Sequence, residues 1–347
     1  MANRGAAKRP SSRFERLTLN TPGFAGVILY CLFMKTGLVS VIVPVFNRDN
    51  FVRDALDSIL GQSYAQVEIV AVNDGSTDNS LAILREYEDR YRGQVIVIDQ
   101  ENQGQVKSRN NAILKANGEY IAFLDSDDLW LPDKLEKQIP LFVGDVGLVY
   151  SAVYIINEHN KVVTTELCEE NVRGDIYLHL LVKNRMTGGS VVVCREAIDK
   201  VGLFDESFPA AENWDLWIRI CKYYTTDYIN EPLVKYRRHS GNMSGDEVLM
   251  IEAIENILNK HSVSETDSSE VKAAYTAAQA NCAYRKGVYN FGQFNFRTAR
   301  ANFREALRLE PNYRDSRARL FRTYLGKHGN RFLAFSKSKL SGRVDAG

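Results

Sequence analysis

Short apolar runs alternate with amphipathic segments along most of the chain from Val39 onward. The runs are rich in β-branched residues and have the length of single buried strands. The first three are VSVIVPV (39–45), VEIVAVN (67–73) and VIVID (95–99). In the segments between them, apolar residues recur every three or four positions, which is the spacing of a helix with one buried face. This alternation predicts βαβ units, and therefore an α/β fold with a mainly parallel sheet covered by helices on both faces.

The same pattern continues to about residue 245. Helices are predicted from about Asn50 to Gly61, after the turn sequence DGSTDNS, and over roughly 105–116. Further strands are predicted at 120–124, 147–154, 190–194 and around Leu233–Tyr236. Residues 246–270 are polar and carry no strand pattern, and the chain beyond them has a helical pattern. We therefore expect one domain over 38–245 and an all-α region over 246–347.

One segment of the helical region, from about Ala280 to Pro311, resembles a known repeat. Small, apolar and terminating residues fall where a tetratricopeptide-type helical hairpin uses them: Gly287, Ala299, Phe303, Ala306, Leu307 and Pro311. Such repeats need about three units for independent stability. A single hairpin would therefore either pack on the first domain or offer a surface to a protein partner.

Charge and cysteine content argue against several classes of protein. Lys and Arg number 44 against 43 Asp and Glu, so the chain lacks the overall basic charge that is typical of nucleic-acid-binding proteins. The five cysteines lie far apart and form no CxxC pair, which argues against a disulfide framework and a structural zinc site. We expect a protein of the reducing cytosol that has no nucleic-acid partner.

Residues 1–37 precede this pattern and are expected to be an extension of the fold. Basic residues between Arg4 and Arg16 come before an apolar run over 23–34, as in a signal peptide. That run has twelve residues and no small-residue cleavage site after it, and it is too short to cross a hydrocarbon layer of ~30 Å. We expect Met34 to be the true start, the upstream residues to be untranslated or disordered, and any membrane contact to be peripheral, at the inner face.

Polar side chains follow four of the predicted strands, at Asn47, Asp74, Asn102 and Asp125. In open α/β sheets, ligands bind at the carboxyl ends of the strands. These positions are therefore the first candidates for a binding site.

The sequence Asp125-Ser126-Asp127-Asp128 is the strongest local signal. Three carboxylates so close together repel one another unless a cation or hydrogen-bond donors offset their charge, and a hard divalent ion bridging to a diphosphate would do so. The alternative is a helix N-terminus, because the following LWLPDKLEKQ has a helical pattern. Asp74 has an alternative of its own, since NDGSTD is also good turn sequence.

Several linked segments resemble the successive motifs of the family 2 glycosyltransferases. The segments are VSVIVPVFNRDNFVRDALDSILGQSY, EIVAVNDGSTDNS, NQGQVKSRNNAILKANGEYIAFLDSDDLWLP, ENWDLWIRI and YRRHSGNMS. The resemblance covers about residues 38–245, in order. It implies the GT-A fold and an inverting transfer of a sugar from a UDP-, GDP- or dTDP-linked donor. By analogy, the acceptor would belong to a surface polysaccharide, a lipid-linked glycan or a glycoprotein.

The resemblance also implies roles for individual residues of the donor site. Pro44, Phe46 and Asn47 would line the nucleotide pocket, Asp74 would accept a hydrogen bond from the base, and Arg109 would reach the nucleotide from the NQGQVKSRNN segment.

A second group of residues is implied to hold the diphosphate and its cation. Asp125 and Asp127, with Asp128 beside them, would bind the ribose and a Mg²⁺ or Mn²⁺ ion that stabilises the leaving group. His239 corresponds to the family's late histidine near the metal or the phosphates.

The chain departs from the family pattern at the expected catalytic base. Many members carry Glu-Asp before the aromatic-Asp-Leu-Trp segment, but this chain has Glu212 and Asn213, and an amide cannot accept a proton as a carboxylate can. Either Glu212 or Asp215 would then serve as the base, and Glu212 is preferred because Asp215 also suits the first turn of a helix.

Two other functions are alternatives to sugar transfer. If neither acid serves, the protein would be a weakened relative that binds a nucleotide sugar or a partner. A sugar-phosphate nucleotidyltransferase would need a glycine-rich loop after the first strand, where this chain has VPVFNRDN.

Overall fold

The structure is a computed structural model that describes residues 35–168, 173–184, 186–208, 210–238 and 245–326. Its strands are β1 (Lys35–Val45), β2 (Val67–Asp74), β3 (Val95–Gln100), β4 (Gly118–Phe123), β5 (Leu129–Trp130), β6 (Val146–Ile156), β7 (Val162–Glu166), β8 (Val192–Cys194) and β9 (Thr225–Arg237). Its α-helices are α2 (Val52–Leu60), α3 (Ser80–Arg90), α4 (Gln105–Lys115), α5 (Lys134–Gln138), α6 (Tyr177–Val182), α7 (Arg195–Val201), α8 (Glu212–Cys221), α9 (Glu247–Lys260), α10 (Ser269–Gly292), α11 (Phe296–Leu309) and α12 (Ser316–Tyr324).

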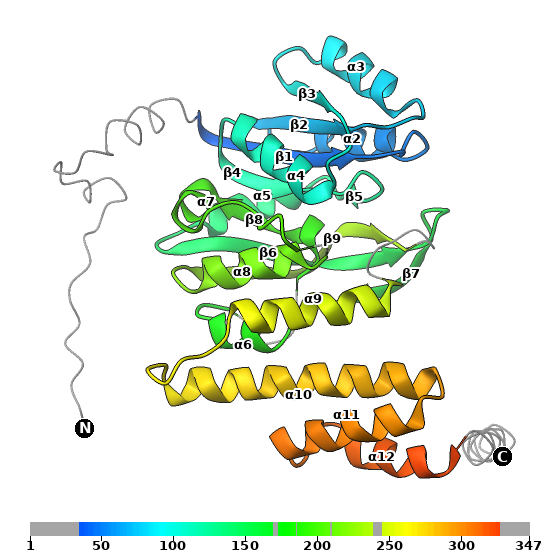
Figure 1. Cartoon of the computed structure of the whole chain (residues 1–347). Coiled ribbons are helices and arrows are strands. Elements are labelled where there is room, and N and C mark those ends of the chain that lie inside the picture. The colour runs from blue at the N-terminus through cyan, green and yellow to red at the C-terminus, as the bar shows by residue number, and fades with distance from the viewer. Residues whose placement is uncertain (1–34, 169–172, 185, 209, 239–244, 327–347) are drawn as a thin grey trace, which may run out of the picture.

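The strands form one nine-stranded sheet in the order β3-β2-β1-β4-β8-β6-β9-β5, with β7 paired to β6 (Figure 1). Strands β1 to β4 are parallel, which confirms the predicted parallel α/β sheet in this half. The second half is mixed, because β8 runs antiparallel to both β4 and β6 while β6 and β9 are parallel. The order reverses between β1 and β4, so the carboxyl ends of β1, β2 and β4 meet at one edge, where open α/β sheets bind ligands.

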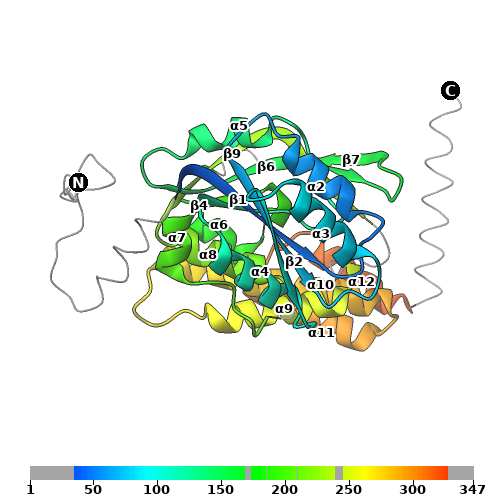
Figure 2. The ribbon, with the colours of Figure 1, turned by 90° about the horizontal axis from the view of Figure 1, so that it is seen from above.

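Helices cover both faces of the parallel half, as predicted. Helices α2 and α3 lie on one side of the sheet, and α4, α7 and α8 lie on the other (Figure 2). Every residue of β2 is buried, and so are eight consecutive residues of β1 (Leu38–Val45). Strands buried on both faces have continuous apolar sequences, which is why these runs were recognisable.

The last four helices stack in layers beyond the sheet (Figure 1). Helix α10 packs on α6, α9 and α11, and α12 packs on α11. Ile254 and Ile257 of α9 and Cys282 of α10 belong to the main hydrophobic core, so the helical region is continuous with the sheet domain. A Cβ atom on Gly287 would lie 2.6 Å from the Phe303 ring, which explains the small residue at this helix crossing. The likeness of this hairpin to a tetratricopeptide repeat stays a prediction.

One predicted helix is wrong at its start. The segment after Asp128 was expected to be helical, but Leu129 and Trp130 form strand β5 and pair antiparallel with Lys235 and Val234 of β9. Helix α5 begins only at Lys134, after Pro132. The acidic cluster therefore lies in a turn between two strands, and it does not cap a helix.

Two predictions concern parts of the chain that the structure covers only partly. The extension is described only from Lys35, where β1 begins, so the expectation about Met34 and the residues before it lies outside the described residues. Among the described cysteines, Cys168, Cys194, Cys221 and Cys282 are free thiols. No helix in the described ranges is both long enough and apolar enough to cross a membrane.

Candidate active site

A cavity of about 1000 Å³ opens at the carboxyl ends of β1, β2 and β4. Its walls come from the loops after these strands, from the start of α4 and of α8, and from the segment before the 3₁₀ turn Gly188–Ser190. Helices α9 and α10 form the far wall. The sheet edge and the helical region thus enclose one cavity.

The end of β1 supplies Pro44 to the cavity and the loop after it supplies Phe46, whose side chain is 46% exposed. Asn47 is not among the lining residues. It adopts a left-handed backbone (φ 51°), and its side-chain oxygen accepts a hydrogen bond of 2.8 Å from the Thr77 backbone N–H. Asn47 therefore ties the loop after β1 to the loop after β2, and this link positions the pocket residues beside it.

Asp74 lies in the cavity wall at the end of β2 and is 3% exposed. Its carboxylate accepts hydrogen bonds from the Gln100 side chain (2.8 Å) and from the backbone N–H groups of Gln103 and Gly104 (both 2.9 Å). Three donors to one buried carboxylate fix the loop that leads into α4. Asp74 is thus more than a turn residue, because it joins two strand ends across the pocket.

The acidic turn presents two of its three carboxylates to the cavity. Asp125 and Asp127 line it, and their side chains are 31% and 11% exposed. Arg48 lies opposite, with its Nε atom 3.5 Å from Oδ2 of Asp127. Arg48 is a lining residue that the sequence analysis did not single out, although it directly follows Asn47.

Asp128 points away from the cavity and is fully buried. Its Oδ1 accepts a 2.8 Å hydrogen bond from the Arg237 backbone N–H, so it joins the turn to β9. Oδ2 has no hydrogen-bond partner in the described part of the chain. Burial, together with the neighbouring Asp125 and Asp127, raises the pKa of Asp128 well above its ordinary value. The expected metal-binding role does not suit a carboxyl group in this position.

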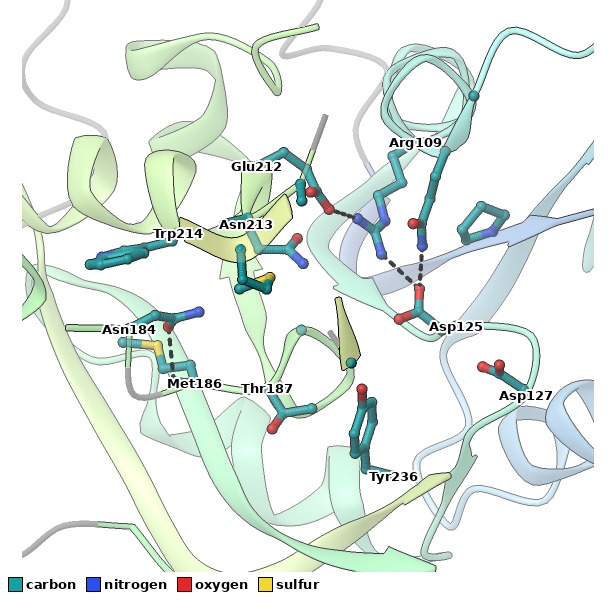
Figure 3. Close-up of a pocket in the computed structure, with 18 of the residues that line it drawn as sticks. Arg109, Asp125, Asp127, Asn184, Met186, Thr187, Glu212, Asn213, Trp214 and Tyr236 are labelled. Carbon is teal, nitrogen blue, oxygen red and sulfur yellow. Dashed lines mark hydrogen bonds and ion pairs between the residues drawn. The ribbon is translucent and has the colours of Figure 1, made fainter. Parts of the chain in front are cut away.

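Arg109 lies between Asp125 and Glu212 at the centre of the site (Figure 3). It belongs to helix α4 and not to the loop before it. Its guanidinium is 2.6 Å from Asp125 and forms a short ion pair with Glu212. Burial opposes the charge of Arg109, but the two carboxylates outweigh burial and raise its pKa. A buried cation thus joins the acidic turn to the start of α8.

Glu212 and Asn213 both line the cavity where α8 begins. Ala211 before them has a left-handed backbone (φ 58°), which is unfavourable for alanine. The Asn213 amide nitrogen lies close to Gly188, and its Oδ1 is buried with no hydrogen-bond partner among the described residues. Figure 3 shows Glu212 turned toward Arg109, whereas Trp214 points away.

Asp215, one turn of α8 after Glu212, is not among the residues that line the cavity. Its buried carboxylate contacts Arg219, Lys260 and His261, each at 2.9 Å. Burial alone would raise the pKa of Asp215, but these three partners outweigh burial and lower it. Asp215 therefore anchors the end of α9 to α8.

Two further parts of the site are the expected histidine and the wall formed by α9 and α10. His239, expected near the phosphates, lies outside the described residues. The far wall consists of Met250 and Ile254 of α9 and Asn281 and Arg285 of α10. Sequence reasoning missed this wall, although the spacing of four residues within each pair places its members on one helix face.

The sequence of this chain is similar to those of known proteins. The family model described as "Glycosyl transferase family 2" matches residues 40–198. A Rickettsia typhi protein named as an uncharacterised glycosyltransferase is 32% identical over 225 residues, which are 63% of this chain and 69% of that protein. A Bacillus subtilis protein named "Putative teichuronic acid biosynthesis glycosyltransferase TuaG" is 30% identical over 60% of this chain and 82% of its own length.

Solved structures share the fold at low sequence identity. Residues 1–349 of TarS from S. aureus align with a TM-score of 0.58 and 16% identity over 83% of this chain and 89% of that one. The mannosyltransferase PcManGT from Pyrobaculum calidifontis aligns with a TM-score of 0.55 and 17% identity over 87% and 92% of the two chains. The fold of this chain is thus shared with these two proteins. On its sequence matches, the chain is a glycosyltransferase and belongs to glycosyl transferase family 2.

Proposed function

We propose that this pocket transfers a sugar from a nucleoside diphosphate sugar to an acceptor hydroxyl, with inversion at the sugar carbon. The observation that carries the proposal is the single cavity of about 1000 Å³ with Asp74, Asp125 and Asp127 on one wall and α9 and α10 on the other. A cavity of this size has room for a donor at the acidic wall and for an acceptor opposite it.

The donor nucleotide would bind at the loops after β1 and β2. Phe46 offers an exposed ring against which a base can stack, and Pro44 forms the floor beside it. Asp74 already accepts three hydrogen bonds, so its part would be to hold the Gln103–Gly104 backbone against the nucleotide. Structures of TarS with UDP-GlcNAc and with UDP, and of PcManGT with GDP-Man, support a nucleotide-sugar donor.

The acidic turn suits Mg²⁺ or Mn²⁺. Asp125 and Asp127 face the cavity with carboxylate oxygens, and Mg²⁺ commonly takes one or two carboxylates together with substrate phosphates and waters. The described residues contain no cluster of three or more His, Cys, Asp or Glu side chains that could hold an ion alone, so the diphosphate would complete the set. A bound ion would neutralise charge on the departing diphosphate. The Mn²⁺ in the PcManGT complex supports this assignment.

Arg48 and Arg109 would act on the donor from the protein side. Arg48 lies beside Asp127 and can reach a phosphate oxygen, whereas Arg109 is held by Asp125 and Glu212. The main role of Arg109 would therefore be to hold the Asp125 and Glu212 carboxylates in position, and not to bind the nucleotide directly.

Glu212 would take the proton of the attacking hydroxyl. It is the carboxylate that the start of α8 presents to the cavity, since Asp215 is anchored to Lys260 and His261 outside it. The Arg109 ion pair holds the Glu212 carboxylate in one orientation at the cavity, and a general base must be positioned before reaction.

The acceptor would enter between the sheet and the helical region. Its wall includes Met250, Ile254 and Arg285, and an adjoining cavity of about 390 Å³ shares Lys183 and Asn184 with the main one. This space extends beyond one sugar, and TuaG is named for teichuronic acid biosynthesis. An acceptor that is part of a polysaccharide or a lipid-linked glycan, reached by peripheral contact with a membrane, fits these observations.

The decisive experiment incubates the purified chain with UDP-, GDP- and dTDP-linked sugars and Mn²⁺ or Mg²⁺, and measures released nucleoside diphosphate. Release from one donor that stops on chelation is the expected result. Binding without release from any donor, with or without added glycan acceptors, would instead favour a nucleotide-sugar-binding protein whose chemistry was lost with Asn213.

A further inference from the structure

The helices α11 and α12 carry a concentrated positive charge. Residues 296–324 contain eight arginines and three carboxylates, a net charge of +5, although the whole chain carries only +1. The rest of the protein is therefore slightly acidic. In Figure 1 these helices lie at the end of the molecule opposite α3.

The arginines of α11 form a stripe along one face of the helix. Arg297, Arg300, Arg304 and Arg308 follow one another at three, four and four positions, so their side chains share a face. The opposite face buries Ala299, Phe303 and Ala306 against α10. The packing of α11 thus leaves the arginine stripe on the outside.

Helix α12 extends this stripe with two aromatic side chains. Arg317, Phe321 and Tyr324 are spaced at four and three positions and share a face, and the two rings are 64% and 54% exposed. The Tyr324 ring contacts the Arg300 guanidinium at 4.8 Å, and its hydroxyl accepts a 2.5 Å hydrogen bond from Arg304. The two stripes therefore form one continuous surface.

Carboxylates neutralise little of this surface. Among the eight arginines of residues 296–324, Arg308 pairs with Glu305 and Arg319 pairs with Asp315. Arg297, Arg300, Arg304 and Arg317 have no carboxylate within 4.0 Å in the described ranges of the chain. Arg300 and Arg304 contact Tyr324, but no carboxylate offsets these four charges, so their arrangement points to an anionic partner outside the chain.

We propose that the α11–α12 face docks the enzyme on an anionic lipid surface, with the arginines against phosphate headgroups and Phe321 and Tyr324 at the acyl boundary. Basic residues next to exposed aromatic side chains are the combination that holds helices in a membrane interface. A purely electrostatic partner, such as an acidic protein or polymer, would leave the exposed Phe321 ring without a role. The inference rests on this surface and is independent of the proposed reaction.

The experiment measures sedimentation of the full chain with vesicles of phosphatidylcholine and with vesicles that also contain phosphatidylglycerol. We expect binding only to the anionic vesicles, weakened by salt. Arg297→Gln, Arg304→Gln and Arg317→Gln combined should weaken it on the order of a hundredfold, since each arginine near the surface contributes about a fivefold change. The matched control changes Arg85 and Arg90 of α3 and Arg92 just after it to Gln, which alters charge equally at the opposite end, and it should bind as wild type.

Phe321→Ser tests the aromatic part separately, at a position too exposed to affect folding. It should weaken vesicle binding roughly tenfold while the salt dependence stays unchanged. Absence of binding to anionic vesicles, or equal loss in the α3 control, overturns the proposal. Wild-type binding by Phe321→Ser would also overturn it, in favour of a general anion-binding face. Nucleoside diphosphate release without vesicles, which should not change in any variant, reports separately on the proposed reaction.

Discussion

Arg109 of α4 and Glu212 of α8 stand 103 residues apart in sequence and form an ion pair whose side chains are only 3% and 5% exposed. Removing one partner of a buried ion pair strongly destabilises a protein, because the charge of the other partner stays buried without compensation. The pair therefore fixes the start of α8 relative to the sheet. The proposed base and the acidic turn consequently share one positioning cation.

Replacing Glu212 by Gln tests the assignment of the base. Turnover should fall by roughly 10²-fold or more, because the amide cannot accept the proton. Donor affinity, measured by calorimetry, should change far less if Glu212 acts only in the chemical step. A parallel loss of donor affinity would instead assign Glu212 to holding Arg109 in place.

Asn213→Asp places a carboxylate where the family pattern has one. With Glu212 as the base, the variant should stay within a few-fold of wild-type turnover, because the added charge lies beside an existing carboxylate. A gain of roughly tenfold or more would move the role of base to position 213. The measurement is nucleoside diphosphate release under saturating donor.

Asp127→Asn tests the acidic turn as a cation site. Asp127 faces the cavity, so losing its charge should weaken metal-dependent donor binding about tenfold or more. Calorimetry with and without Mn²⁺ measures this difference. Asp133→Asn is a suitable control, because Asp133 lies nearby, pairs with Lys137 and does not line the cavity. Equal affinity in the Asp127 variant and the wild type would remove Asp127 from the site.

The parallel half of the fold could be predicted from sequence because its strands are buried on both faces and read as unbroken apolar runs. The pairing of the short strands β5 (Leu129–Trp130) and β8 (Val192–Cys194) could not be predicted. Each pairs with a strand that is distant in sequence, β5 with β9 and β8 with β6. Motif resemblance identified the acidic turn, but it could not say that Asp127 faces the cavity while Asp128 is buried. That difference comes from the Arg237 backbone N–H, which holds Asp128 inward.

The wall formed by α9 and α10 also lay beyond sequence reasoning. Met250 and Arg285 look like ordinary helix residues, and their place in the pocket depends on how the helical region packs against the sheet domain. Similarly, Asp215 could be either a base or a helix residue until its contacts with Lys260 and His261 were known. In each case the deciding contact joins segments that are far apart in the chain.

Asp215→Asn should lower the free energy of unfolding by about 3 kcal/mol at neutral pH, because it leaves Arg219 and Lys260 without a buried carboxylate. The folded-state pKa of Asp215 lies below its unfolded value. Its contribution is therefore complete above about pH 4 and is lost as the pH falls through the folded-state pKa. Denaturant titrations of both proteins at neutral and acid pH measure this, and a difference that grows on acidification would contradict the assignment.

Gly287→Ala tests whether the helical region packs as one body with the sheet domain. The added Cβ would meet the Phe303 ring at 2.6 Å, so the α10–α11 contact must separate, at a cost of about 1–3 kcal/mol. Gly292→Ala in the same helix is the matched control, since its Cβ meets nothing within 4 Å and should not destabilise the helix. Thermal unfolding measures both. Because α9 and α10 share the main core, we expect a single transition that shifts down in the Gly287 variant; a separate early transition would show that α11 and α12 unfold independently of the pocket.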